Sequence, residues 1–289
     1  FATQAFRMTA PSRGFVDKLL ALYQTRREAG DDFESALIEP LAAILASPGF
    51  LYLMEPNSTD ATRELDDIEL AVRLSYFLWS GPPDEELYKA ARKGKLGKAS
   101  ELRRQTDRML SDPKAWEFYS GFTEQWLHMD RLDFFQFNFE KFPEFDDSSK
   151  ASARNEIYHT LKLLVDENLS IENLLKSDFV VVNDLLAEYY GLEGVQGSHF
   201  RKVAVPSDSP RGGLLGTAAV LAMGSDGERS SPVERGAWVL RKLLNDPPPP
   251  APANVPQLSR LSDQMLSARD LQQAHMEEPQ CAQCHRKID

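Results

Sequence analysis

The stretch Leu65-Asp66-Asp67-Ile68-Glu69-Leu70-Ala71-Val72-Arg73-Leu74-Ser75-Tyr76-Phe77-Leu78-Trp79 sets the structural class of this chain of 289 residues. Its apolar side chains recur at intervals of three and four residues, which is the period of an amphipathic helix. Its acidic residues gather in the first turn, where carboxylates complement the positive end of the helix dipole. The stretch therefore predicts a helix with one buried face.

Similar patterns extend in both directions from this stretch. They predict helices from Phe15 to a stop at Gly30 and over residues 33–46, 82–94, 100–110, 113–128, 148–168, 182–190, 212–223 and 233–244. Residues 200–205 are the best candidate for a strand, and this candidate is short. We therefore expect a mainly α fold with a multi-helix globular body.

Two segments break the helical pattern. Residues 134–145 are rich in phenylalanine, contain Pro143 and show neither period, so we expect an irregular arm whose rings fill the core rather than a platform for a ligand. Residues 247–260 are rich in proline and favour polyproline II, which rises ~3.1 Å per residue. We expect a semi-rigid strap along the surface; the alternative is a ligand for a protein-docking groove.

The C-terminal sequence Cys281-Ala282-Gln283-Cys284-His285 contains the only two cysteines of the chain. C-x-x-C-H is the attachment signature of a c-type haem. Two thiols at this spacing can form thioethers to the two vinyl groups of one porphyrin, and the adjacent His285 then reaches the iron as proximal ligand. The motif predicts one covalent haem c per chain, held in a C-terminal attachment segment.

Other chemistries use a C-x-x-C pair, namely a structural disulfide, a redox dithiol and half of a zinc site. Structural zinc takes four ligands, commonly from two such pairs, and the chain has no second pair. A zinc site would have to recruit His199 or His275, which lack any paired spacing. A thioredoxin-type dithiol belongs near a βαβ pattern, which is not visible around residue 281.

The charge balance narrows the class of partner. The chain has 33 basic and 44 acidic side chains, a formal net charge of −11. A nucleic-acid binder normally shows a basic face, so we expect no nucleic-acid partner. No apolar run approaches the length of a membrane span. Since c-type haem is attached outside the cytoplasm in bacteria, we expect a periplasmic or otherwise exported protein, and Phe1 indicates a processed or truncated start.

The other ligands of such a haem are less sharply indicated. His275, or Met276 beside it, could reach the distal face; the alternatives are a surface role for His275 and a ligand from sequence beyond this chain. Arg229 and Arg235 flank a polar loop at residues 224–232 and could pair with haem propionates, because an arginine fork suits a carboxylate. A helix cap at Ser230 or Ser231, followed by Pro232, explains part of this loop without any ligand.

Acid–base chemistry has weaker support. Asp226 and Glu228 form the only acidic pair in a loop with small residues, whereas Asp66, Asp67 and Glu69 are most simply explained as dipole partners at a helix start. His128 follows an apolar helix face and is expected in the core. Phosphate-cradling glycine loops, serine-nucleophile elbows and helical metal motifs are absent from the sequence.

An ordered series of short motifs resembles the large planctomycete-type cytochrome c proteins, which are built of consecutive domains of unknown function. The motifs are Ala5-Phe6-Arg7, Leu65-Asp66-Asp67, residues 73–80, Gln125-Trp126-Leu127, Phe142-Pro143-Glu144-Phe145, residues 183–191, Gly212-Gly213-Leu214-Leu215-Gly216-Thr217, residues 229–236, Trp238-Val239-Leu240, Asp246 with the proline run, Asn254-Val255-Pro256 and residues 281–289. The resemblance covers nearly the whole chain. It implies an exported protein with c-type haem and implies no established reaction.

The resemblance also implies a longer polypeptide. Family members commonly continue past C-x-x-C-H-x-x-x-D with a further domain, and many carry another cytochrome segment before Ala-Phe-Arg. We expect five segments: an N-terminal helical segment at 1–60, a central helical domain at 61–197, a small helical and loop domain at 198–246, the strap at 247–260 and a truncated haem-attachment segment at 261–289.

Three functions are compatible with these features. The first is electron transfer within a larger protein or complex, with a redox partner protein or other subunits as partners. The second is a haem-dependent redox enzyme of peroxidase or oxidase type, which needs an open distal face. The third is a structural or binding subunit whose haem site is completed by another chain.

Overall fold

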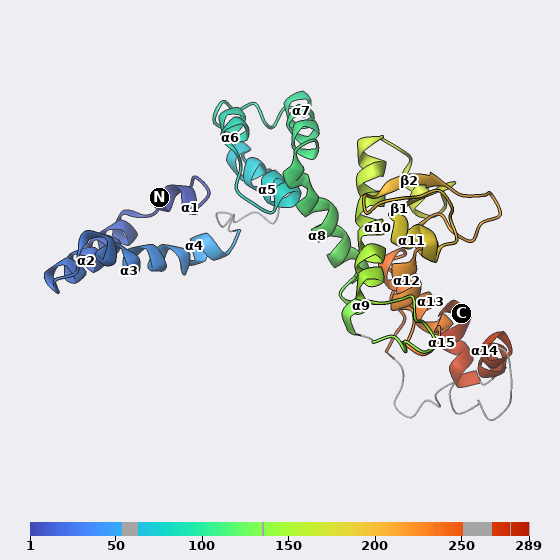
Figure 1. Ribbon diagram of the computed structural model, residues 1–289. Coiled ribbons are helices and arrows are strands. Elements are labelled where there is room, and N and C mark those ends of the chain that lie inside the picture. Colours follow the sequence, from blue (N-terminus) through green and yellow to red (C-terminus); the bar gives the residue numbers. More distant parts are fainter. Residues whose placement is uncertain (54–62, 135, 251–267, 278, 289) are drawn as a thin grey trace. The chain divides into compact units, whose positions relative to one another are not determined.

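The computed structural model describes residues 1–53, 63–134, 136–250, 268–277 and 279–288 (Figure 1). It is mainly helical, with a single two-stranded sheet among these residues, which confirms the predicted fold class. The chain forms two compact units, Phe1–Phe118 and Tyr119–Asp289. The division into five segments stays a prediction, and residues 251–260 of the expected strap lie outside the described part.

The first unit begins with α1 (Ala2–Ala5), α2 (Arg13–Glu28), α3 (Phe33–Leu45) and α4 (Pro48–Leu51). The side chains of Ser12 and Asp32 accept hydrogen bonds from the first turns of α2 and α3 and so define where these helices start. The two helices pack against each other across a turn at Gly30, whose φ of +99° favours glycine.

The rest of the first unit is built on the helix predicted at residues 65–79. This helix is α5 (Asp67–Trp79), followed by α6 (Glu85–Arg92) and α7 (Ala99–Leu110). Asp66 and Glu69 form a capping box at its start. Its apolar face joins α6 and α7 in one buried cluster, and Trp79 Nε1 donates to the Met109 carbonyl at 3.0 Å.

The second unit contains the larger core. Helix α8 (Trp116–Leu127) runs into this unit from the first unit, which also contains η1 (Pro113–Ala115). The remaining elements of the second unit are α9 (Arg131–Phe134), α10 (Asp147–Asp166), η2 (Ile171–Leu174), β1 (Phe179–Val182), α11 (Asp184–Tyr189), β2 (Arg201–Ala204), η3 (Leu214–Gly216), α12 (Ala218–Met223), α13 (Pro232–Lys242), α14 (Ala268–Glu277) and α15 (Pro279–Ile288). Contacts run in series from β1 to α10, α10 to α12, α12 to α13 and α13 to α15 (Figure 1). The terminal helix is therefore the last layer of this packed series.

The sheet corrects the predicted start of the helix at residues 182–190. Residues 200–205 do contain a strand, β2, but Val182 does not start a helix, because it ends β1, antiparallel to β2 with Val182 opposite Arg201. All four residues of β1 are buried. A short continuous apolar run has no period that separates a buried strand from a buried helix, so the sequence pattern missed β1. Asn183 then caps α11.

The helix expected over residues 212–223 is also shorter than predicted. Gly212 and Gly213 have φ values of +97° and +83°, and α12 starts only after Thr217. A Cβ on Gly212 would lie 2.1 Å from the Ser177 carbonyl oxygen, and one on Gly213 would lie 2.4 Å from that of Leu175. This glycine motif therefore serves a close backbone approach rather than a helix.

The phenylalanine-rich segment is irregular, as predicted, between α9 and α10 in its described residues. Phe137 meets Phe145 edge-on with ring centroids 4.9 Å apart, and Phe145 lies against Tyr189 at 5.6 Å. The prediction for His128 is wrong, because this residue is exposed with a φ of +54° just after the end of α8. Its position in the left-handed turn places it outside the apolar face that its neighbours form.

Candidate functional site

The motif Cys281-Ala282-Gln283-Cys284-His285 lies wholly within α15. Residues three and four apart share one helix face, so Cys284 and His285 lie on the same side of α15 as Cys281. A porphyrin that binds two thiols and one imidazole needs this one-sided arrangement. The sequence spacing and the observed helix therefore agree on a single face for the three residues.

Both cysteines are free thiols, which argues against a structural disulfide. Cys281 is buried, whereas Cys284 and His285 are half-buried. Among the described residues, no group of three His, Cys, Asp or Glu side chains could hold a metal ion. Two free thiols and an adjacent imidazole fit the donor set of a c-type haem.

Helix α15 is held on α13 by a close backbone contact. A Cβ on Gly236 would lie 1.8 Å from the carbonyl oxygen of Ile288, so only glycine permits this approach. Lys287 forms an ion pair with Asp246, just beyond α13. Helix α14 packs on α15 as well. The C-x-x-C-H helix is thus a docked part of the second unit.

The predicted distal ligands lie in the neighbouring helix. His275 and Met276 both belong to α14, and Met276 is half-buried. The side chain of His275 lies outside the described part of the structure. The distal role of His275 stays a prediction, although α14 and α15 are packed neighbours.

The polar loop between α12 and α13 is closed by its own hydrogen bonds. Ser225 and Ser230 form an isolated bridge, and one carboxylate oxygen of Asp226 accepts from the amides of Glu228 and Arg229 at 2.9 and 2.8 Å. The Glu228 carboxylate binds Asn138 and Lys141 of the phenylalanine-rich segment. The acidic pair therefore shapes and anchors the loop, which explains it without catalysis.

The two arginines proposed from this loop have different surroundings. Arg229 is exposed and lies 3.8 Å from Asp226, whereas the half-buried side chain of Arg235 lines a cavity. Ser231 caps α13 and Pro232 occupies its first turn, as the cap interpretation predicts. Arg235 immediately precedes Gly236, so it lies on the stretch of α13 that receives α15.

Sequence reasoning missed a buried polar network near this cavity. Glu156 of α10 is 1% exposed and accepts a hydrogen bond of 2.5 Å from the Tyr190 hydroxyl, which in turn accepts one of 2.7 Å from the Ala218 amide. Burial raises the pKa of Glu156 to about 8, while the bond from Tyr190 and the charge of Arg211 act in the opposite direction. A single acid within a helical pattern gives no sequence signal of such burial.

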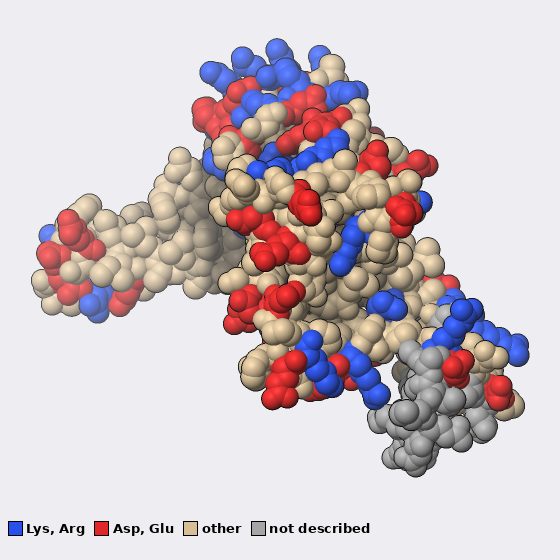
Figure 2. Space-filling view, turned by 45° about the vertical axis from the view of Figure 1, so that its right-hand side comes forward, with Lys and Arg blue, Asp and Glu red and all other residues tan. Residues whose placement is uncertain are grey.

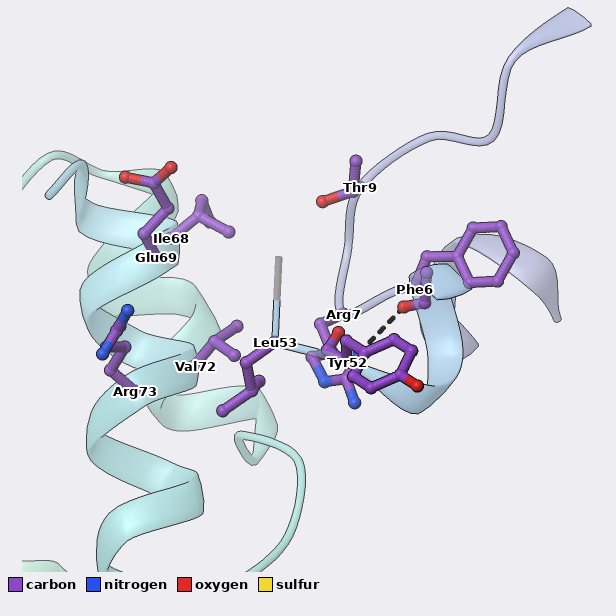
Figure 3. Close-up of a pocket in the computed structure, with 10 residues that line it drawn as sticks. Phe6, Arg7, Thr9, Tyr52, Leu53, Ile68, Glu69, Val72 and Arg73 are labelled. Atoms are coloured by element: carbon purple, nitrogen blue, oxygen red, sulfur yellow. Dashed lines mark hydrogen bonds between the residues drawn. The ribbon is translucent and has the colours of Figure 1, made fainter. Parts of the chain in front are cut away.

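A second cavity, of about 150 Å³, lies in the first unit beside α5 (Figure 3). Two of its charged groups, those of Arg7 and Glu69, have partners within the protein, although the buried Nε of Arg7 has none among the described residues. Arg7 donates to the carbonyls of Gly49, Phe50 and Tyr52 at 2.8, 2.6 and 3.2 Å, and so satisfies the end of α4. Glu69 pairs with Arg63 at 2.5 Å. The motif Ala5-Phe6-Arg7 therefore has a structural explanation, and we assign no site here.

The surface is neither uniformly acidic nor uniformly basic. On the face drawn in Figure 2, acidic and basic side chains are interspersed. No helix within the described residues has the length and apolarity needed to cross a membrane.

The helical fold and the terminal C-x-x-C-H helix define a mainly α protein with a cytochrome c-like segment. Three family models match in consecutive order: PSD5, a protein of unknown function (DUF1595), at residues 1–55, PSD4, a protein of unknown function (DUF1592), at residues 65–192, and PSCyt3, a protein of unknown function (DUF1588), at residues 211–289. This series matches the chain to the planctomycete-type cytochrome c domain proteins, which confirms the resemblance. Searches of curated proteins and of solved structures gave no match.

Proposed function

We propose that this chain is part of an exported c-type haem protein that transfers electrons within a larger protein or complex. One observation carries the proposal: two free thiols and the adjacent His285 share one face of α15, within the segment that matches PSCyt3. Cys281 and Cys284 would form the thioethers, and His285 would be the proximal ligand. The bound haem would supply a one-electron iron couple.

The protein's own contribution is to place that face. The contact of Gly236 with Ile288 and the ion pair of Asp246 with Lys287 anchor α15 beyond the motif, so they restrict how its ligand face can turn. A rigidly held axial ligand suits electron transfer, because little reorganisation accompanies the change of charge. Arg229 and Arg235 remain proposed propionate partners, and Arg235 has the more enclosed side chain.

The direct test is the intact mass of the chain after expression in a host that attaches c-type haem. We expect one haem adduct in the native sequence and none in a Cys281→Ser/Cys284→Ser variant. The native sequence without an adduct, in a host that loads a control cytochrome c, would refute the proposal.

The proposed distal role of His275 has its own test. In the haem-loaded, reduced protein, CO should bind to a His275→Ala variant and not to the native chain, and His199→Ala should behave like the native chain, because His199 is exposed beside β2. CO binding to the native chain would indicate an open distal face and favour the redox-enzyme alternative. If neither variant binds CO, His275 is not the distal ligand, and Met276 would be tested in the same way.

A further inference from the structure

A cavity of about 270 Å³ lies in the second unit between the phenylalanine-rich segment, α12 and the loop before α13. Phe137, Phe142, Phe145 and Tyr189 supply its aromatic wall. The rings of Phe137 and Phe142 are nearly perpendicular, at 87°, as are those of Phe137 and Phe145, at 80°. These rings pack edge-to-face against one another, and together with Tyr189 they give the cavity an apolar aromatic wall for a ligand.

Two arginines give the same cavity a positive charge. Arg211 and Arg235 both line it, and no Asp or Glu does so among the described residues. Neither guanidinium forms an ion pair with a described carboxylate at 4.0 Å or less. An apolar cavity with two unneutralised arginines favours an anion with an apolar body.

Each arginine is held in place by the surrounding chain. Arg211 Nη1 donates to the Gly216 carbonyl at 2.8 Å, and its guanidinium lies 3.9 Å from the centre of the Tyr190 ring. The aliphatic part of the Arg235 side chain passes over Gly224. A Cβ on Gly224 would lie only 2.1 Å from the Cγ of Arg235. The glycine therefore makes room for this particular path of Arg235 along the loop.

The nearest buried acid leaves this charge uncompensated. Glu156 acts on Arg211 electrostatically, but its burial raises its pKa to about 8, so at neutral pH its carboxyl group is largely protonated. The Tyr190 hydroxyl donates a hydrogen bond to one carboxyl oxygen of Glu156. Glu156 thus supports the position of Tyr190 under Arg211 without cancelling the positive charge.

We propose that this cavity is a binding site for a carboxylate carried on a flat apolar body, with Arg211 and Arg235 as its charge partners. The carboxylate would face the two guanidinium groups, whose forks match its oxygens, and the flat body would pack among the phenylalanine rings. Such a ligand could be a free aromatic carboxylate or a propionate of a haem attached at Cys281 and Cys284. The site stands without the haem, because every residue that forms it lies outside the C-x-x-C-H helix.

The test titrates 2-naphthoate into two forms of the full chain, one carrying the haem and the other a haem-free Cys281→Ser/Cys284→Ser variant, by isothermal calorimetry. We expect saturable binding that weakens roughly tenfold or more in Arg211→Gln and in Arg235→Gln, since hydrogen bonds to charged groups are among the strongest that proteins form. Arg241→Gln is the matched control and should bind normally, because Arg241 is exposed in the last turn of α13 and does not line the cavity. The uncharged analogue 2-naphthamide should bind weakly to the native chain. Its affinity should be no higher than that of 2-naphthoate for the arginine variants.

The two forms separate the possible sources of the carboxylate. Binding to both forms identifies a site for a free aromatic carboxylate, whereas binding only to the haem-free form identifies a haem propionate as its occupant. Circular dichroism checks folding, and Arg235→Lys, which keeps the charge but loses the fork, replaces Arg235→Gln if that variant does not fold. No saturable binding to either form, or binding unaffected by both arginine substitutions, would overturn the site while leaving haem attachment untouched.

Discussion

Gly236 of α13 and Ile288 of α15 approach so closely that a Cβ on the glycine would lie 1.8 Å from the isoleucine carbonyl oxygen. No rotamer change can relieve such a clash, because both groups belong to the backbone. The contact joins the helix that carries the C-x-x-C-H motif to the core of the second unit. It is therefore a means by which the fold fixes the orientation of the candidate haem ligands.

We expect Gly236→Ala to detach or shift α15. In the haem-free chain, the buried Cys281 thiol should react with a maleimide more slowly than Cys284, and Gly236→Ala should remove this difference. Mass spectrometry of labelled peptides measures both rates. Gly14→Ala is the control: its new Cβ meets nothing within 4 Å in α2, and it should stabilise that helix by up to about 1 kcal/mol without changing thiol reactivity. Unchanged protection of Cys281 in Gly236→Ala would contradict the docking role.

Glu156 should make stability fall with rising pH. Its pKa rises from 4.5 in the unfolded chain to about 8 in the folded one, so the folded state holds a proton that the unfolded state releases between these values. The free energy of unfolding should therefore decrease across pH 4.5–8, by up to about 1.4 kcal/mol per pH unit from this group. Urea unfolding at pH 5 and pH 8 measures the slope.

Glu156→Gln supplies the comparison for this slope, because glutamine keeps the size of the side chain and does not titrate. We expect the variant to have a shallower pH dependence and to gain stability relative to the native chain as the pH rises. Parallel profiles for the two proteins would show that Glu156 does not retain its proton in the folded state.

The glycine pair before α12 should be intolerant of side chains. At Gly213, alanine would combine the strain of a φ of +83° with a Cβ 2.4 Å from the Leu175 carbonyl, and we expect a loss of several kcal/mol. Gly191→Ala has similar strain, with a φ of +69°, but nothing within 4 Å, so it should cost only about 1–2 kcal/mol. Denaturant unfolding of both variants measures the difference. Equal losses of stability would contradict the role of the close backbone approach at Gly213.

The two compact units allow their stabilities to be tested separately. Trp79 Nε1 donates to Met109 in the first unit, and Trp238 Nε1 donates to Leu127 in the second, each at 3.0 Å and buried. Trp238→Phe removes this donor from the buried Leu127 carbonyl, at a cost of about 1–3 kcal/mol. Trp79→Phe should cost less, because the Met109 carbonyl also accepts from the Asp112 amide at 3.2 Å. Hydrogen exchange should show that each variant loses protection mainly in its own unit. Equal loss across both units would mean that they unfold as one.

Local patterns accounted for many features of this chain. Alternation at three and four residues placed α5, and the Ser231 cap marked the start of α13, because a cap bonds to amides only two or three residues away. The C-x-x-C-H motif was likewise identified from nearby residues alone, whereas its position within a helix, α15, came from the structure. The ordered motifs were sufficient to find the resemblance that the three consecutive family models support.

Tertiary structure decided what depends on distant neighbours. The strand β1 exists because Arg201–Ala204 pairs with it and α10 covers it, which no period within Phe179–Val182 records. Burial of Glu156 and the pairing of Arg211 with Arg235 in one cavity likewise depend on residues far apart along the chain. The sequence by itself determined most helices before residue 244 and the C-x-x-C-H motif, because these depend on nearby residues. The structure placed that motif in a helix, and long-range packing decided where this helix is anchored and which charges lie together.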